Sequence, residues 1–98
     1  MAPFPEELAQ CTGFQWDAGN AAKNWKLHRV SQAECEQVFF NRPLRVAPDQ
    51  KHSLQEPRLA ALGRTNAGRL LSIVFTARGT LVRVISARDI ESERTEAV

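Results

Sequence analysis

The residues best suited to chemistry in this sequence are arginines that no acid accompanies. From Pro57 to Arg88 the chain holds neither Asp nor Glu, yet it carries six arginines: Arg58, Arg64, Arg69, Arg78, Arg83 and Arg88. A guanidinium is a rigid fork of donors that fits the oxygens of a phosphate. The segment is therefore expected to face phosphate, the alternative being that about half of these arginines are solvated strand-edge residues that discourage aggregation.

Three other side chains could transfer a proton, namely His28, His52 and Glu56. Cleavage of RNA without a metal needs a base for the ribose 2′-hydroxyl, cations for the phosphate and an acid for the leaving 5′-oxygen. Histidine suits proton transfer because its ordinary pKa is about 6.5. Each residue also has a structural reading: His28 as a helix cap, His52 as a solvated loop residue and Glu56 as an arginine partner. The sequence leaves open which of them is the base.

Metal chemistry finds little support in the sequence. Cys11 and Cys35 stand apart without a CxxC spacing, and neither histidine lies at a zinc-like spacing from them. We predict that the protein uses no metal and no cofactor. Cys35 falls on the apolar side of an expected helix, which favours a buried and unreactive thiol.

The overall charge of +2 is the sum of three segments that differ in net charge. Residues 1–56 hold six Lys or Arg against seven Asp or Glu, residues 57–88 hold six against none, and residues 89–98 hold one against four. The basic central block indicates an anionic partner.

With 98 residues and no long apolar run, the chain is expected to form one domain that does not cross a membrane. The first ten residues lack the basic region of a signal peptide, so the cytoplasm is the expected location.

The expected organisation is a flexible lead-in over residues 1–12, a single domain over 13–90 and an acidic tail or short helix over 91–98. A short strand is predicted at 14–16, and Asp17 is a suitable N-cap for a first helix over 18–28. The core-facing stripe of that helix is expected to be Ala18, Ala21, Ala22 and Trp25. Candidate RNA-binding residues, on the opposite helix side or in the basic block, are Lys23, Lys26, Arg69, Arg78 and Arg83.

The sharpest local signal is a capping box, Ser31-x-x-Glu34, which predicts a second helix of about ten residues that ends before Pro43. A strand at 44–47 and a polar loop at 49–57 follow. Beyond the loop, three apolar runs are separated by Gly-containing breaks, the pattern of an antiparallel meander. These elements predict an α+β fold in which two N-terminal helices pack on a small antiparallel β-sheet.

The order of these motifs resembles that of the BrnT family. In the first half the likeness rests on Phe14-x-Trp16-Asp17, Asn24, His28-x-Val30 and the capped helix that ends in Val38-Phe39-Phe40. In the second half it rests on His52-Ser53, Glu56-x-Arg58, Leu62-Gly63-Arg64-Thr65, Gly68-Arg69-Leu70-Leu71, Thr76-x-Arg78-Gly79 and Arg83-x-Ile85-Ser86-Ala87-Arg88. The ordered set covers residues 14–90. The chain has no Tyr, and it departs from the family pattern at Asn20, Leu27, Arg29 and Leu59.

The resemblance implies a toxin of a type II toxin–antitoxin pair with a RelE-like fold, a ribonuclease that inhibits translation. Such a toxin would be neutralised by BrnA, a ribbon-helix-helix antitoxin, in a hetero-oligomer that contacts DNA only through the antitoxin. Taken with the chemistry above, the implied catalytic residues are His28, His52, Glu56, Arg58, Arg64 and Arg88. The alternative is a catalytically degenerate module that binds the antitoxin or nucleic acid without cutting.

Overall fold

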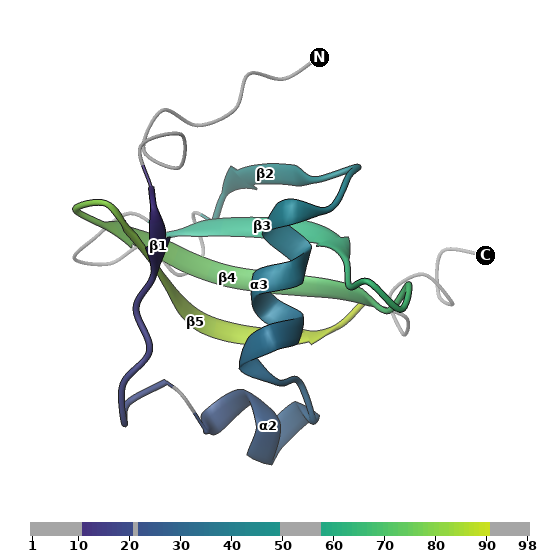
Figure 1. Cartoon of the computed structure of the whole chain (residues 1–98), viewed down its shortest axis with the longest axis horizontal. Helices are drawn as coiled ribbons and strands as arrows, with labels where there is room; N and C mark the ends of the chain where they lie inside the picture. Colours follow the sequence, from purple (N-terminus) through teal and green to yellow (C-terminus); the bar gives the residue numbers. More distant parts are fainter. Residues whose placement is uncertain (1–10, 21, 50–57, 91–98) are drawn as a thin grey trace.

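A computed structural model describes residues 11–20, 22–49 and 58–90 of the chain. This part forms a five-stranded mixed sheet with helices on one face (Figure 1). The strands are β1 (Gly13–Phe14), β2 (Arg45–Pro48), β3 (Leu59–Arg64), β4 (Leu70–Arg78) and β5 (Leu81–Asp89), in the spatial order β1-β5-β4-β3-β2. The helices are α2 (Lys23–His28) and α3 (Gln32–Phe40), which follow β1 and precede β2 in the chain.

The antiparallel meander predicted from the second half of the sequence is confirmed. β2 pairs antiparallel with β3, β3 with β4, and β4 with β5. The two breaks are tight turns in which Gly68 (φ 89°) and Gly79 (φ 61°) adopt a left-handed backbone that a side chain would strain. Within β4 the alternate residues Leu71, Ile73 and Phe75 are fully buried, because the two-residue period of a strand directs them toward the helices.

Helix α3 begins where the capping box predicts. Ser31 Oγ accepts a hydrogen bond from the Glu34 amide at 3.1 Å, and Glu34 Oε1 accepts one from the Ser31 amide at 3.0 Å. Cys35 and Val38 are fully buried on the inner face of the helix, which packs on β3 and β4. The predicted burial of Cys35 is therefore confirmed, and this burial raises the pKa of its thiol to about 12.

The first helix differs from the prediction at its start and on its buried face. It begins at Lys23, and Asp17 does not cap it: Asp17 Oδ1 accepts a hydrogen bond from the Gly19 amide at 2.8 Å in a turn that precedes the helix. The predicted core stripe is wrong, because Asn24 is buried while Trp25 is 51% exposed.

Asn24 is buried, and Trp25 exposed, because α2 packs against the unpaired edge of β5. β1 covers only the first part of this edge, and beyond it the backbone groups of β5 need other partners. Asn20 Nδ2 donates to the Val84 carbonyl at 2.9 Å, and Asn24 Oδ1 accepts from the Ala87 amide at 2.9 Å. Two asparagine side chains thus continue the sheet edge, which explains why α2 turns a polar residue inward.

The predicted sheet is correct in its class, α+β, but wrong in its details. The helices lie between strands, since β1 precedes them and pairs parallel with β5, so the sheet is mixed. β1 ends before Trp16, whose indole Nε1 donates to Glu36 Oε2 at 2.8 Å. Phe14 packs edge-on against Phe39 at 5.5 Å between ring centroids, and Phe39 packs against Phe75 at 5.0 Å. This aromatic contact ties β1, α3 and β4 into one core.

Several predictions fall on residues that the structure does not describe. The predicted lead-in is described only from Cys11 and the loop after β2 only up to Asp49, and the predicted tail, 91–98, lies outside the described residues. The predicted catalytic residues His52 and Glu56 therefore lie outside the described residues. Among the helices that are described, none has the length and apolar character needed to cross a bilayer.

Candidate functional site

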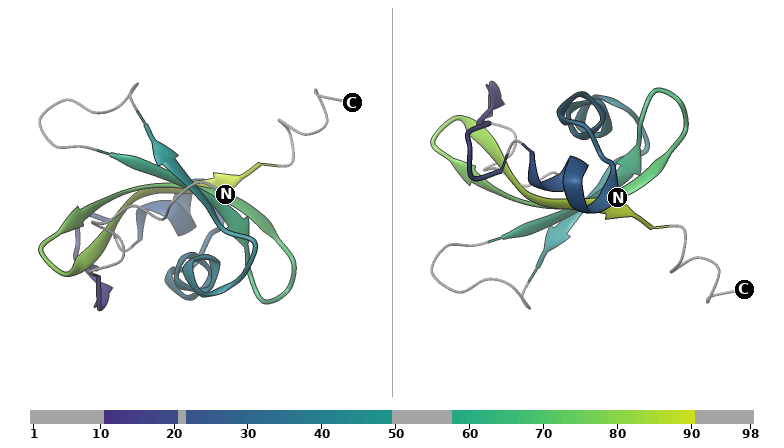
Figure 2. Two further views of the ribbon diagram at one scale, coloured as in Figure 1. Left: turned by 90° about the horizontal axis from the view of Figure 1, so that it is seen from above. Right: turned by 90° about the horizontal axis from the view of Figure 1, so that it is seen from below.

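One face of the sheet is covered by no described element, because both helices pack on the other face (Figure 2). The alternation along β3 separates the two sides: Ala61 and Gly63 are buried toward α3, whereas Leu62 and Arg64 are exposed. We refer to the uncovered side as the open face. The sequence-based grouping of alternate residues was Arg58, Ala60, Leu62 and Arg64, and the burial pattern of β3 confirms it for Leu62 and Arg64.

Sheet register assembles three arginines at one end of the open face. Arg45 on β2 pairs with Leu62 on β3. Leu62 pairs in turn with Ser72 on β4, and Ser72 pairs with Arg88 on β5. Adjacent strands lie about 4.8 Å apart, so this row separates the Cα atoms of Arg45 and Arg88 by roughly 14 Å. Arg64 is two residues along β3 from Leu62, or about 7 Å. We term Arg45, Arg64 and Arg88 the basic end.

The charge of the basic end is not neutralised within the described residues. Arg45 and Arg88 are exposed, and neither forms an ion pair with a described residue. Arg64 Nη2 donates to the Arg42 carbonyl at 2.9 Å, which orients the guanidinium and leaves its charge uncompensated. Three positive charges fixed on one sheet surface attract phosphates.

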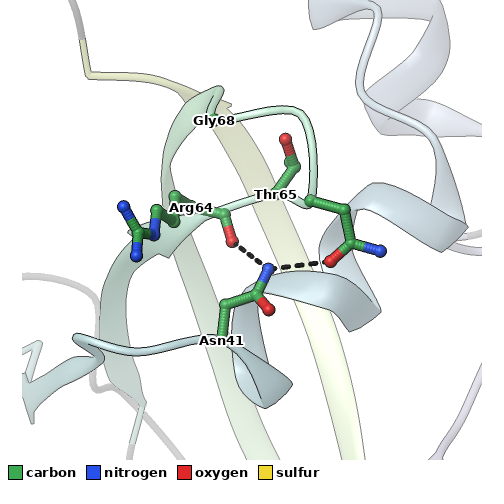
Figure 3. A pocket seen from close by; sticks show the side chains of 5 residues that line it. Asn41, Arg64, Thr65 and Gly68 are labelled. Atoms are coloured by element: carbon green, nitrogen blue, oxygen red, sulfur yellow. Dashed lines mark hydrogen bonds between the residues drawn. The ribbon is translucent and has the colours of Figure 1, made fainter.

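Two hollows adjoin at Arg64. The larger, of about 530 Å³, is mostly apolar and is lined by Pro43, Arg45, Leu62, Gly63, Arg64, Leu70 and Ile90. The smaller, of about 390 Å³, is polar and is lined by Asn41, Arg64, Thr65, Asn66 and Gly68 (Figure 3). Because Arg64 lines both, a group bound at its guanidinium would have access to an apolar recess and to a polar one.

Arg69 is a predicted RNA-binding residue, but in the structure its guanidinium contacts protein groups on several sides. Nε and Nη2 donate to the Asp89 carboxylate at 2.6 and 2.9 Å, and Nη1 donates to Glu34 Oε2 at 3.1 Å. Further hydrogen bonds reach the carbonyls of Arg29 at 2.8 Å and His28 at 3.1 Å. The hydrogen bonds from Arg69 are the main cause that holds the pKa of Asp89 below its ordinary value. Arg69 thus joins the end of α2, the start of α3 and the end of β5.

The other predicted RNA-binding cations lie away from the basic end. Arg83 Nη1 donates to Asp17 Oδ2 at 2.7 Å, only 15% of the Arg83 side chain is exposed, and this hydrogen bond lowers the pKa of Asp17. Arg78 ends β4 at the opposite end of the sheet. The remaining two are on α2, which covers the helix side of the sheet, and are Lys23 and Lys26.

His28 is the predicted proton-transfer residue that the structure describes. It ends α2 and is half-buried. It lies close enough to Asp89 to lower the pKa of that carboxyl, although the effect of Arg69 is larger. Since Asp89 directly follows Arg88, its side chain lies on the other face of the sheet, and His28 is therefore at the same end of the sheet as the basic end but on the face that the helices cover.

The segment that contains His52 and Glu56 is flanked by residues at the far end of the sheet. The Asp49 amide donates to the Arg58 carbonyl at 2.8 Å, so the two flanking residues pair directly. Arg58 and Arg64 are six residues apart along an extended strand, which corresponds to about 20 Å. Of the six predicted catalytic residues, the structure therefore places Arg58 at one end of the sheet and Arg64 and Arg88 at the other, on the open face; His28 lies at that same end but on the face that the helices cover.

Sequence analysis did not single out Arg45. The available signal was alternation, because Val46 packs against the core and leaves Arg45 and Ala47 to share the open face. Only the register of β2 on β3 brings Arg45 level with Arg88, and a four-residue strand does not encode its register locally.

The site offers positive charge to a phosphodiester. Guanidinium groups can stabilise the charge that develops on the equatorial oxygens of a phosphoryl transition state. Of the predicted proton-transfer groups, His28 lies among the described residues. Within residues 11–20, 22–49 and 58–90, no three His, Cys, Asp or Glu side chains are grouped closely enough to hold a metal ion.

Comparison of the sequence with known proteins identifies its family. No curated protein matches the chain. A family model described as "Ribonuclease toxin, BrnT, of type II toxin-antitoxin system" matches residues 16–93. The match spans most of the chain, including both helices, β2 to β5 and all three arginines of the basic end. The chain therefore belongs to the BrnT family of ribonuclease toxins of type II toxin–antitoxin systems.

Proposed function

We propose that this protein is a metal-independent endoribonuclease that binds RNA on the open face of its sheet and thereby inhibits translation in the cytoplasm. The observation that carries the proposal is the basic end: three arginines, from β2, β3 and β5, on a sheet face that no described element covers. Family membership supplies the substrate class, RNA, and the existence of an antitoxin partner. The basic end supplies a surface on which that substrate can bind.

RNA would bind through charge and apolar contact together. Phosphates contact the guanidinium groups, and each contact releases counterions from the strand, so affinity falls with salt. The apolar hollow beside Arg64 offers Leu62, Leu70 and Ile90 to the face of an unstacked base. This combination favours a flexible single strand, whose bases are free to leave the stack, over a duplex.

Cleavage needs no metal if the arginines supply the positive charge. A base removes the proton of a ribose 2′-hydroxyl, the 2′-oxygen attacks phosphorus, and the 5′-oxygen leaves with a proton from an acid, which gives a 2′,3′-cyclic phosphate. Arg64 and Arg88 stabilise the pentavalent phosphate. The proton-transfer groups in this proposal are His28, which lies at the same end of the sheet on its helix-covered face, together with His52 and Glu56. Arg58 contacts the substrate at the far end of β3.

The binding part of the proposal is tested with charge-matched variants. Arg45→Gln and Arg88→Gln each remove one positive charge from the basic end, and Arg29→Gln removes one from the end of α2, where Arg29 stacks over Trp25. Affinity for a single-stranded oligoribonucleotide is measured against salt. Each basic-end variant should reduce the slope of log K against log salt by about 0.7, and Arg29→Gln should leave it unchanged. Equal effects of all three variants would show that RNA does not bind on the open face.

The chemical part is tested with purified protein and labelled RNA in the presence of a chelator. Product ends that carry a 2′,3′-cyclic phosphate are expected, with a rate that Arg64→Gln and Arg88→Gln both reduce by at least tenfold, about 1.4 kcal/mol of transition-state stabilisation. Cleavage that stops in the chelator and returns with a divalent cation would refute the metal-independent mechanism.

The partner in this proposal is a ribbon-helix-helix antitoxin that forms a hetero-oligomer with the toxin. Expression of the toxin alone should reduce incorporation of labelled amino acids into protein, and co-expression of the adjacent small gene should restore it. A stable complex with that gene product, without growth arrest by the toxin alone, would instead identify a non-catalytic antitoxin-binding module.

A further inference from the structure

The residues that end α3 contact Arg64, an arginine of the basic end, at two points. The Asn41 side chain reaches its main chain, because Asn41 Nδ2 donates to the Arg64 carbonyl at 2.9 Å (Figure 3). The Arg42 main chain reaches its side chain, because the Arg42 carbonyl accepts from Arg64 Nη2 at 2.9 Å. Two neighbouring residues at the end of one helix therefore hold both the backbone and the guanidinium of Arg64.

The strand end that carries Arg64 is also held close to α3 on either side of this residue. Gly63, which precedes Arg64, passes so near the helix that an added Cβ would lie 2.9 Å from Val38 Cγ1. In the turn that follows, the Asn66 amide donates to Gln37 Oε1 at 3.0 Å. The backbone of Arg64 is therefore fixed relative to the last turn of α3.

Asn41 is held in the orientation that its contact with Arg64 requires. Its backbone amide donates to the Gln37 carbonyl at 3.1 Å, which keeps the residue at the end of the helix. Its Nδ2 donates to Asn66 Oδ1 at 3.0 Å as well as to the Arg64 carbonyl. Because a carbonyl oxygen can only accept, the side-chain amide must turn its nitrogen toward Arg64. A substitution that removes this nitrogen removes the side-chain bond between the helix end and the Arg64 backbone.

Holding Arg64 before RNA binds matters because an arginine side chain is long and flexible. An exposed arginine loses rotamer freedom when it binds a phosphate, and a side chain already held in one orientation loses less. The Arg42 carbonyl engages Nη2 and leaves the other N–H groups of the guanidinium for phosphate oxygens. This carbonyl belongs to the residue after Asn41, so the bond from Asn41 to β3 also places the acceptor that orients Arg64.

We propose that Asn41 is a positioning residue for Arg64. By joining the end of α3 to the end of β3, it keeps the Arg42 carbonyl in place, and that carbonyl directs the Arg64 guanidinium toward the phosphate that is cleaved. The proposal rests on the proposed function, since it assigns a role in the same reaction. Asn41 transfers no proton and carries no charge, so its effect on the reaction passes through Arg64.

The proposal is tested with a double-mutant cycle on the rate of RNA cleavage. The wild type, Asn41→Ala, Arg64→Gln and the double variant are compared in single turnover with protein in saturating excess, so that differences in affinity do not contribute. Asn41→Ala should lower the rate about three- to tenfold, the effect of losing one hydrogen bond. In the Arg64→Gln background the same substitution should lower it less than about twofold, because no guanidinium is left to position.

Gln37→Ala is the matched control. It also removes a hydrogen bond between the last turn of α3 and the turn after β3, but that bond reaches Asn66 and not Arg64, so the rate should stay within about twofold of the wild type. Thermal unfolding sets an assay temperature at which every variant is folded. A general loosening of the helix end would slow Gln37→Ala and Asn41→Ala alike, and it would appear in both backgrounds of the cycle.

The outcomes separate the positioning role from the proposed function. If Arg64→Gln is slow but Asn41→Ala cleaves like the wild type, or if the two effects multiply in the double variant, the positioning role is refuted and the proposed function stands. Equal losses in Asn41→Ala and Gln37→Ala would refute it as well. If the wild type leaves RNA intact, or if Arg64→Gln cleaves as fast as the wild type, the proposed function fails and the positioning role fails with it.

Discussion

Replacing Arg69 by alanine should destabilise the fold far more than replacing Arg88 by alanine. Both arginines belong to the same basic stretch of sequence, and composition alone treats them alike. In the structure Arg69 joins three elements through Glu34, Asp89 and two backbone carbonyls, whereas Arg88 is exposed and forms no ion pair with a described residue. The comparison separates an arginine that holds the fold together from one that is available to a ligand.

The magnitude of the effect follows from the contacts of Arg69. Partly exposed ion pairs contribute about 0.2–1 kcal/mol each, and the partners here are Glu34, 27% exposed, and Asp89, 45% exposed. The two-pronged contact with Asp89 favours the upper part of that range. Hydrogen bonds to the two carbonyls add about 0.5 kcal/mol each once exposure to water is allowed for. The expected loss is about 2–3 kcal/mol, which lowers the Tm of a domain of this size by roughly 8–24 °C.

The loss of stability should depend on pH. The pKa of Asp89 is depressed chiefly by hydrogen bonds from Arg69, and that of Glu34 chiefly by the Ser31 amide and then by Arg69. A carboxylate with a depressed pKa stabilises the folded state above its unfolded pKa, about 4, and loses that effect as the pH falls through the folded value. The stability difference between the wild type and Arg69→Ala should therefore be complete at pH 7 and should narrow below about pH 4.

Thermal unfolding followed by circular dichroism measures both effects. Arg88→Ala is the control, and its Tm should lie within about 2 °C of that of the wild type, since exposed substitutions without partners change stability little. Two results would contradict the structural role of Arg69. One is an Arg69→Ala protein as stable as Arg88→Ala at pH 7, and the other is a stability gap that stays constant in acid.

Three further predictions concern the core and its edge. Asn24→Ala removes the buried acceptor of the Ala87 amide, and it should lower the free energy of unfolding in urea by about 1–3 kcal/mol; an unchanged midpoint would show that the edge of β5 needs no side-chain partner. Gly63→Ala places a Cβ 2.9 Å from Val38 Cγ1, and this overpacking should cost about 1–3 kcal/mol in the same assay, a result that a wild-type midpoint would contradict. Cys35 should resist iodoacetamide in the native protein and react after unfolding, because its thiol is buried; mass spectrometry that finds it modified in native protein would show that the core opens readily.

Elements determined by local chemistry could be predicted from the sequence. The capping box fixes the start of α3, because Ser31 and Glu34 satisfy each other's amides whatever the rest of the chain does. The meander could be predicted because alternation and the turn glycines Gly68 and Gly79 are signals within a few residues of one another. The motifs of this same half also carry the family resemblance that the family model bears out.

Elements determined by distant partners could not be predicted. The local sequence of the first helix predicts that an apolar stripe including Trp25 faces the core. In the structure the unpaired edge of β5 makes Asn24 the buried residue and leaves Trp25 exposed. The same holds for β1, whose two residues carry too little pattern to show that they pair parallel with β5.

The sequence by itself determined that the chain has a basic, acid-free segment, a capped helix and a three-stranded meander, and that these occur in the order of a BrnT toxin. It offered all six arginines of that segment as contacts for RNA or its phosphates, either catalytic or RNA-binding. Only the tertiary structure divided them, because each arginine's partners come from segments remote in the chain: Arg69 meets Glu34 and Asp89, while Arg88 meets no described acid and lies level with Arg45 across four strands. Whether an arginine binds other protein groups or stays exposed therefore depends on which distant segments pack beside it, and that is decided by the packing of the whole sheet.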